Sequence, residues 1–273
     1  MQIQSDPPIQ TYTSQEDFVV ARTGRLLGKA AALVYILGRR TVFNATTPFQ
    51  DLATYLVGGQ NALNTVSVTT PYFIVSTSAT DVAGSAGISA VRIIYLDEFG
   101  GQKSKTVFLN GTTKVDIGSG YSAFQWIESA ALGTAAASAA VGDIAIFSGA
   151  GAAAAEATTV EQILATGNRS LTGRYTIPAG YTGYLKRWVT TAAGSQAMDI
   201  RLRAEVFADD RTLSAGIFHF QASSYLGAGT NASDELLSLA LPELCMVKTS
   251  VYPAATTGTP RCDVNVRLLI VAK

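Results

Sequence analysis

The sequence predicts an all-β protein made of two β-sandwich domains of jelly-roll-like type, preceded by an extended N-terminal arm. Short alternating runs of β-branched and aromatic residues recur along the chain, separated by clusters of Gly, Pro, Asn and Ser. The length of 273 residues is large for one sandwich and sufficient for two. Hydrophobic residues make up 48% of the chain, so each domain has material for a core.

We expect residues 1–36 to form the arm and a connecting segment. Pro7 and Pro8 favour extended chain over helix. Ser14, followed by two acidic residues, resembles a helix start, and Gly24 limits that helix to a few turns. In an assembly such an arm often reaches a neighbouring subunit.

The first sandwich domain is expected over residues 37–150. Its clearest element is a hairpin within residues 90–113, where two alternating runs flank Gly100 and Gly101. The glycines permit the positive φ angles that a tight hairpin turn needs. Further strands are expected over residues 33–37, 40–43, 64–78, 121–129 and 142–148, with a short helix or turn over 48–52.

The second sandwich domain is expected over residues 151–273. Alanine-rich runs at residues 130–140 and 150–157 mark the change in composition, and interrupting glycines indicate packed loops there. Residues 198–207 alternate apolar with charged side chains, which predicts a strand with one buried and one wet face. Other strands are expected over residues 174–177, 181–189, 213–221 and 263–272, with a strand or one helical turn over 159–165.

Composition restricts the partners and the compartment. Twenty basic and twenty acidic residues cancel, which argues against nucleic acid as a partner. No apolar run reaches transmembrane length and no secretory leader opens the chain, so we expect synthesis in a cytoplasm and no membrane partner. Charged residues make up only 15%, which favours a surface covered by neighbours. We expect Cys245 and Cys262 to be buried free thiols, with a disulfide between them as the alternative.

Side chains suited to catalysis are scarce. The single histidine, His219, lies in an expected strand, and one histidine excludes a multi-histidine metal site. No nucleotide-binding or nucleophile-elbow motif is present. Acidic pairs begin at Asp97, Asp209 and Asp234, but solvated turns explain them more simply than a glycosidase or calcium site. The sequence therefore predicts no enzyme, no cofactor and no metal; a hydrolase with a carboxylate pair ranks last.

Interface residues are expected among exposed aromatic and arginine side chains, which supply most anchors at protein interfaces. Tyr12 and Phe18 lie near the arm, and Tyr225 lies in an expected loop before a glycine. Arg39 and Arg40 are placed to pair with acidic groups of a partner subunit, with a solvated face as the alternative.

Several motifs, in order, resemble a group of tailed-phage virion proteins common in podovirus-like and marine phages. Residues 74–87 resemble the Ser-, Ala-, Asp- and Gly-rich segment that leads into a hairpin in that group, and TVFLNGTT at 106–113 resembles its ETV-LNGTT element. The segment YTIPAGYTGYL at 175–185 resembles YTVPAGKTAYL, and residues 264–271 resemble the closing strand. An early FGRN element is similar to residues 37–40, although Arg40 departs from it.

The resemblance implies a non-enzymatic virion structural protein that oligomerises and binds the phage capsid surface as a cement or decoration protein. Its expected partners are further copies of itself, for example in a trimer, and the major capsid protein or other virion proteins. Its expected location is the virion, after synthesis in the host cytoplasm. The alternative is a tail- or vertex-associated adaptor or a fibre module that binds a receptor or carbohydrate.

Overall fold

The structure, a computed structural model, describes residues 15–44, 49–56, 60–205, 218–255 and 260–273. These residues form an all-β protein of antiparallel sheets with one short helix, α1 (Gln15–Thr23). The short helix expected near Ser14 is confirmed, and acidic residues in its first turn suit the helix dipole. No helix within the described residues has the length and apolar character to cross a membrane.

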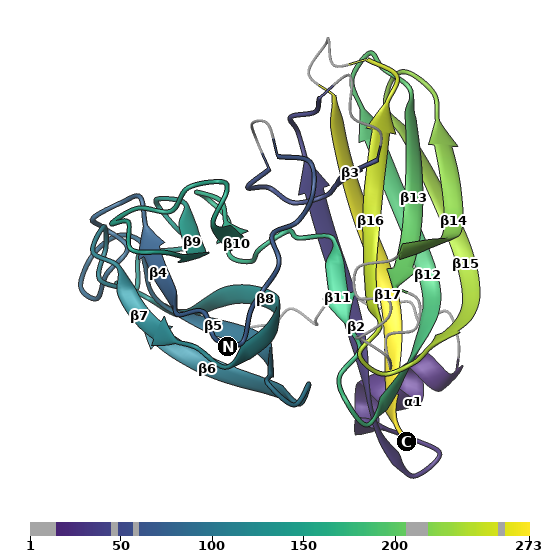
Figure 1. Ribbon diagram of the computed structural model, residues 1–273, viewed down its shortest axis with the longest axis horizontal. Coiled ribbons are helices and arrows are strands. Elements are labelled where there is room, and N and C mark those ends of the chain that lie inside the picture. The colour runs from purple at the N-terminus through teal and green to yellow at the C-terminus, as the bar shows by residue number, and fades with distance from the viewer. Residues whose placement is uncertain (1–14, 45–48, 57–59, 206–217, 256–259) are drawn as a thin grey trace, which may run out of the picture.

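Two sheets share the larger hydrophobic cluster and form what we call the terminal unit, at the right of Figure 1. Val34, Trp188 and Val266 of one sheet meet Ile200 and Val247 of the other within this cluster. The first sheet runs β1 (Arg25–Leu26), β2 (Lys29–Arg40), β17 (Arg261–Ala272), β12 (Tyr181–Ala193) and β15 (Asn231–Leu241), and the second runs β11 (Arg174–Thr176), β16 (Met246–Pro253), β13 (Met198–Glu205) and β14 (Phe218–Leu226), with β3 (Gln50–Asp51) paired to β16.

The strands between β3 and β11 form the inserted unit, at the left of Figure 1. Its own cluster includes Ile74, Ile93, Phe124 and Ile146, which are almost fully buried. The third sheet runs β10 (Thr159–Ile163), β9 (Ile144–Ser148), β4 (Tyr72–Ser76) and β7 (Val115–Gly118), and the fourth runs β6 (Gln102–Phe108), β5 (Ile88–Asp97) and β8 (Tyr121–Leu132).

The hairpin expected within residues 90–113 is confirmed as β5 and β6. The Asp97 carboxylate accepts hydrogen bonds from the backbone N–H groups of Phe99 and Gly101, 3.0 and 2.8 Å long. Gly100 adopts a φ of 78°, a left-handed conformation that favours glycine. Asp97 is therefore a turn-forming residue, in keeping with the simpler interpretation of this acidic pair.

The clusters divide the chain differently from the expected domains 1–36, 37–150 and 151–273. Strand β2 crosses the first boundary, because its inward side chains continue one core alternation and pair along β17. The second boundary falls between β9 and β10, which are hydrogen-bonded neighbours. The expected arm, through residue 14, lies outside the described residues.

Several element expectations also need correction. Of residues 64–78 only β4 is a strand, and 48–52 contains the two-residue β3. The strand expected over 213–221 is β14 from Phe218 onward, which extends to Leu226 and places Tyr225 in a strand instead of a loop. Strands β15 and β16 had not been expected. As expected, neither alanine-rich run forms a helix.

One buried aspartate joins three loops of the inserted unit, two through its carboxylate and one through its backbone carbonyl. Asp81 is fully buried, and its oxygens accept hydrogen bonds from the Ser76 hydroxyl and from the backbone N–H groups of Ile88, Val141 and Gly142, at 2.5–3.1 Å. The Asp81 backbone carbonyl accepts a further N–H bond. The Ser- and Gly-rich motif around residues 74–87 is thus explained by packing.

Candidate interaction site

Charged and aromatic side chains gather on the outward face of the second sheet. Strand β13 alternates strictly, so Asp199, Arg201, Arg203 and Glu205 point away from the core, as the sequence predicted. The neighbouring strands and the residue preceding β3 add rings around these charges. We call this set the aromatic–arginine face: Phe49, Arg201, Arg203, Phe218, Phe220, Tyr225 and Tyr252.

Two arginines contact the three phenylalanine rings of this face. The Arg201 guanidinium carbon lies 3.6 Å from the ring centroid of Phe49 and 5.6 Å from that of Phe220. Arg203 lies 5.6 Å from the Phe218 ring. Because guanidinium groups attract the faces of aromatic rings, these contacts preorder the surface before any partner binds.

The face leaves much of its apolar area in water. Tyr225 is 73% exposed, Phe220 55% and Tyr252 37%. Exposed aromatic side chains beside arginine are typical of protein–protein contact surfaces, where Tyr, Phe and Arg are enriched. His219 is also exposed on β14.

The residues expected at an interface lie in different parts of the molecule. Tyr225 lies on the aromatic–arginine face, and Phe18 is 46% exposed on α1, away from it. Tyr12 lies outside the described residues. The partly exposed Arg39 forms an ion pair with Asp263 of its own chain. Whether any of them contacts a partner stays a prediction.

Arg40 corrects the sequence analysis, because it is a buried residue of the terminal unit and is only 1% exposed. Its guanidinium donates hydrogen bonds to the backbone carbonyls of Val42, Asp51 and Gln60 at 2.6–3.0 Å. Burial lowers its pKa to about 10, although the charge of Asp51 acts in the opposite direction. Arg40 fixes the segment that leads from β3 towards the inserted unit and presents no charge to a partner.

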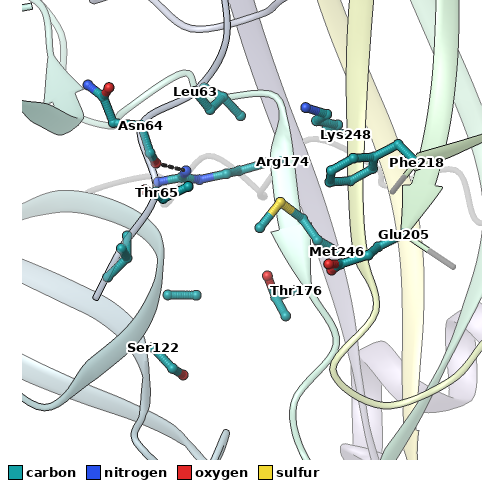
Figure 2. Close-up of a pocket in the computed structure, with 12 residues that line it drawn as sticks. Leu63, Asn64, Thr65, Ser122, Arg174, Thr176, Glu205, Phe218, Met246 and Lys248 are labelled. Atoms are coloured by element: carbon teal, nitrogen blue, oxygen red, sulfur yellow. Dashed lines mark hydrogen bonds between the residues drawn. The ribbon is translucent and has the colours of Figure 1, made fainter. Parts of the chain in front are cut away.

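A cavity of about 400 Å³ lies between the second sheet and the inserted unit (Figure 2). On one side lie Arg174, Met246, Phe218 and Lys248 from the second sheet; on the other lies the segment 63–66, with part of β8. Figure 2 shows Arg174 reaching to this segment, where it donates a 3.2 Å hydrogen bond to the Asn64 carbonyl. The cavity is therefore a seam between the two units.

A buried ion pair closes this seam. Glu161 of β10 is fully buried and lies 3.3 Å from Arg174 of β11, which is 5% exposed. Glu161 also accepts a 2.8 Å hydrogen bond from the Thr172 hydroxyl. Arg174 donates a further bond to the Val160 carbonyl at 2.9 Å. The pair links the inserted unit to the second sheet.

A second buried ion pair lies beside it, below the aromatic–arginine face. The Asp51 carboxylate accepts hydrogen bonds from Lys248 Nζ at 2.8 Å and from the Ser250 hydroxyl at 2.7 Å. Lys248 also lies 4.1 Å from the centroid of the Phe218 ring. The base of the face is thereby fixed to β3 as well as to the second sheet.

Protonation of Glu161 is expected to raise the free energy of unfolding as the pH falls from 8 to 5. Burial raises the pKa of Glu161 to about 7, against the opposing charge of Arg174 and hydrogen bonds from Ser170 and Thr172. The nearby Arg169 and Tyr55 also interact electrostatically with this carboxyl. In this window the folded chain keeps a proton that the unfolded chain releases, so the stabilisation is complete below about pH 4.5 and is lost through pH 7.

Urea unfolding at several pH values tests this, with Glu161→Gln as the control. The wild-type chain is expected to gain on the order of 1–3 kcal/mol over the variant between pH 8 and pH 5. A difference between the two chains that stays constant across this range would contradict the shift.

The described residues offer few candidates for a metal site or a reactive thiol. Among the described residues no group of three or more His, Cys, Asp or Glu side chains is placed to hold a metal ion. Cys245 and Cys262 are buried free thiols, so the expected disulfide alternative is not formed. Burial raises the pKa of Cys245 to about 12, which makes it unreactive at neutral pH. Asp234 of the third acidic pair forms an ion pair with Arg187; Asp209 lies outside the described residues.

Comparisons with known proteins give no family. No protein-family model and no curated protein matches the chain. Among solved structures, one of infectious bursal disease virus, Gx strain, is similar at 9% identity and a TM-score of 0.23, covering 89% of this chain and 76% of that one. A mutant VP2 protein of the same virus, in T=1 particles, matches with the same identity and TM-score over 89% and 74% of the two chains. At such TM-scores neither likeness bears on the function of this chain.

Sequence reasoning missed most of the aromatic–arginine face. Phe49 is separated from β13 by about 150 positions, so no local pattern connects its ring with Arg201. Phe218 and Phe220 flank His219 in the sequence, and this alternation was an available signal for a strand with both rings on its outward side. Arg201 and Arg203 were expected on the outward face of their strand, and Tyr225 was the one member of the face named as an interface residue.

Proposed function

We propose that the chain is a non-enzymatic virion structural protein of a tailed phage, which associates with itself and binds the capsid surface as a cement or decoration protein. In this proposal each unit is a β-sandwich of jelly-roll-like type that serves as a scaffold. The protein acts in the virion after synthesis in the host cytoplasm. The observation that carries the proposal is the aromatic–arginine face.

The face supports binding for two reasons. Its exposed aromatic rings are unfavourable in water, and its arginine contacts preorder the phenylalanine rings before a partner binds. Rings of Phe220, Tyr225 and Tyr252 remain in solvent, although a stable core lies beneath them. Burying such rings against a partner contributes roughly 25 cal/mol per Å² of apolar area. Many copies on a lattice multiply a modest affinity at each contact. The ordered motif resemblance and the low charge content support the same proposal.

A second candidate is an adaptor or fibre module that binds a receptor or carbohydrate. Tyr225 favours it, because a phenol ring that is 73% exposed can stack on a sugar as well as on a protein side chain. Binding of the purified chain to a glycan array, lost on Tyr225→Ala, would support this candidate over the capsid surface.

Co-sedimentation with capsid particles that lack the protein tests the proposal. The double variant Phe220→Ser with Tyr225→Ser is expected to bind about tenfold more weakly or worse, since central aromatic anchors at interfaces carry about 2 kcal/mol or more each. Phe108→Ser is the matched control, because Phe108 is 71% exposed on β6 of the inserted unit. Equal binding by the double variant and the wild type would overturn the role of the face.

A further inference from the structure

The first sheet ends in a long open edge. Strand β15 pairs with β12 over residues 231–241, and no described strand pairs with its other side. A row of backbone N–H and C=O groups along eleven residues is therefore available for another strand. In Figure 1, β15 lies at the border of the terminal unit farthest from the inserted unit, with no labelled strand beyond it.

The other sheet edges in the described residues are short or protected. Strand β2 pairs with β1 only at Lys29 and Ala30, but farther along this edge its Arg39 N–H donates to the Leu171 carbonyl and Arg169 donates to the Tyr35 carbonyl. Strands β1, β7, β10 and β11 have two to five residues, and β6 carries Lys103 and Lys105. The edge of β8 is bonded to residues 168–170 through Ser129 and Ile127. The ladder of β14 is interrupted by a bulge. Charges, bulges and short length are the usual means by which proteins keep edges from pairing.

Strand β15 has little such protection. It contains no Pro, Lys or Arg, and its second half reads Leu-Leu-Ser-Leu-Ala-Leu. The Asp234 carboxylate is neutralised by Arg187 of the neighbouring strand. Like β14, strand β15 has one bulge in its ladder, where Leu237 and Ser238 stand opposite Lys186, but its exposed and half-buried side chains alternate without a break, unlike those of β14. Leu236, at the middle of the strand, is 76% exposed.

We propose that β15 pairs antiparallel with β15 of a second copy, about a two-fold axis at Leu236. Centred there, each Leu236 faces its own counterpart and loses its exposure to water. Asp234 faces Ser238 of the second copy and Glu235 faces Leu237, so no acidic side chain faces another. Because a two-fold interface must be complementary to itself, this register satisfies both the apolar and the charged positions.

The pairing would join two five-stranded sheets into one continuous sheet across the dimer. This inference deepens the self-association in the proposed function and names its surface. It uses the first sheet, whereas the aromatic–arginine face belongs to the second, so both surfaces are available at once. A dimer would then present two capsid-binding faces, which raises its avidity for a lattice.

Cysteine cross-linking of the full chain tests the register. Leu236→Cys is expected to form a disulfide-linked dimer under mild oxidation, because facing residues of antiparallel strands have Cα atoms about 4.5–5.5 Å apart. Ser238→Cys is the matched control: the two Ser238 residues would lie about 13 Å or more apart, at roughly 3.3 Å per residue, beyond disulfide reach. The native cysteines are buried and do not compete.

Light scattering after gel filtration gives the second readout. The wild type is expected to have the mass of two chains, and Leu236→Lys the mass of one, whereas Phe108→Lys, an equally exposed substitution on β6, stays dimeric. A wild-type mass of one or three chains, or cross-linking at residue 238 as efficient as at 236, would overturn the pairing. A monomer that still sediments with particles would refute the pairing alone, and a dimer that does not bind particles would refute the capsid role alone.

Discussion

Replacing Asp81 with alanine is expected to lower the free energy of unfolding by about 3–5 kcal/mol. The change removes the acceptor for three buried bonds, from the Ser76 hydroxyl and the N–H groups of Ile88 and Gly142, and for a partly buried bond from the Val141 N–H. Each buried donor left without a partner costs about 1–3 kcal/mol, and water reaching the site offsets part of the sum. Gly87 lies directly against this carboxylate, since an added Cβ there would lie 2.0 Å from an Asp81 oxygen.

Equilibrium urea unfolding measures this loss. Asp116→Ala is the matched control, because Asp116 is an exposed aspartate of the same unit whose carboxylate accepts one bond, from the Gly118 N–H at 2.7 Å. We expect the control to cost less than about 1 kcal/mol. An Asp81→Ala chain as stable as the Asp116→Ala chain would show that the Asp81 carboxylate does not hold its two loops together.

Arg174→Met is expected to destabilise the chain by about 3–5 kcal/mol at pH 8. It leaves the Glu161 carboxylate buried without its counter-charge and removes the bonds to the carbonyls of Asn64 and Val160. At pH 6 the loss is expected to shrink, because a protonated Glu161 no longer needs a partner charge. Urea unfolding at the two pH values gives both numbers.

The double variant Glu161→Leu with Arg174→Met separates the ion pair from the packing. A buried pair replaced by apolar side chains of similar size is often nearly neutral, so the double variant is expected to recover most of the stability lost by Arg174→Met. Losses that simply add would contradict coupling between the two residues. Arg39→Met serves as a control with a partly exposed pair, for which we expect less than about 1 kcal/mol.

Local patterns in the sequence predicted local structure well. The alternation in residues 198–207 gave β13 and its charged face, and the glycines at 100 and 101 gave the turn between β5 and β6. In both cases the signal is carried by neighbouring residues. The short helix before Gly24 was also predicted, for the same reason.

Long-range pairing was not predictable from such patterns. Strand β2 completes its sheet with β17, more than 200 residues later, so the domain boundary near residue 37 had no local signal against it. Arg40 was assigned to the surface because arginine is rarely buried, but three backbone carbonyls surround its guanidinium. The buried alternation of Val247, Thr249 and Val251 is a local signal for β16, a strand that had not been expected.

Quantitative mass spectrometry of purified phage particles, with the major shell protein as the internal reference, tests the central claim most directly. A cement or decoration protein is expected at hundreds of copies per particle. A dozen copies or fewer would contradict the lattice-covering role and favour a vertex or tail position. Complete absence of the chain from the particles would refute a virion role altogether.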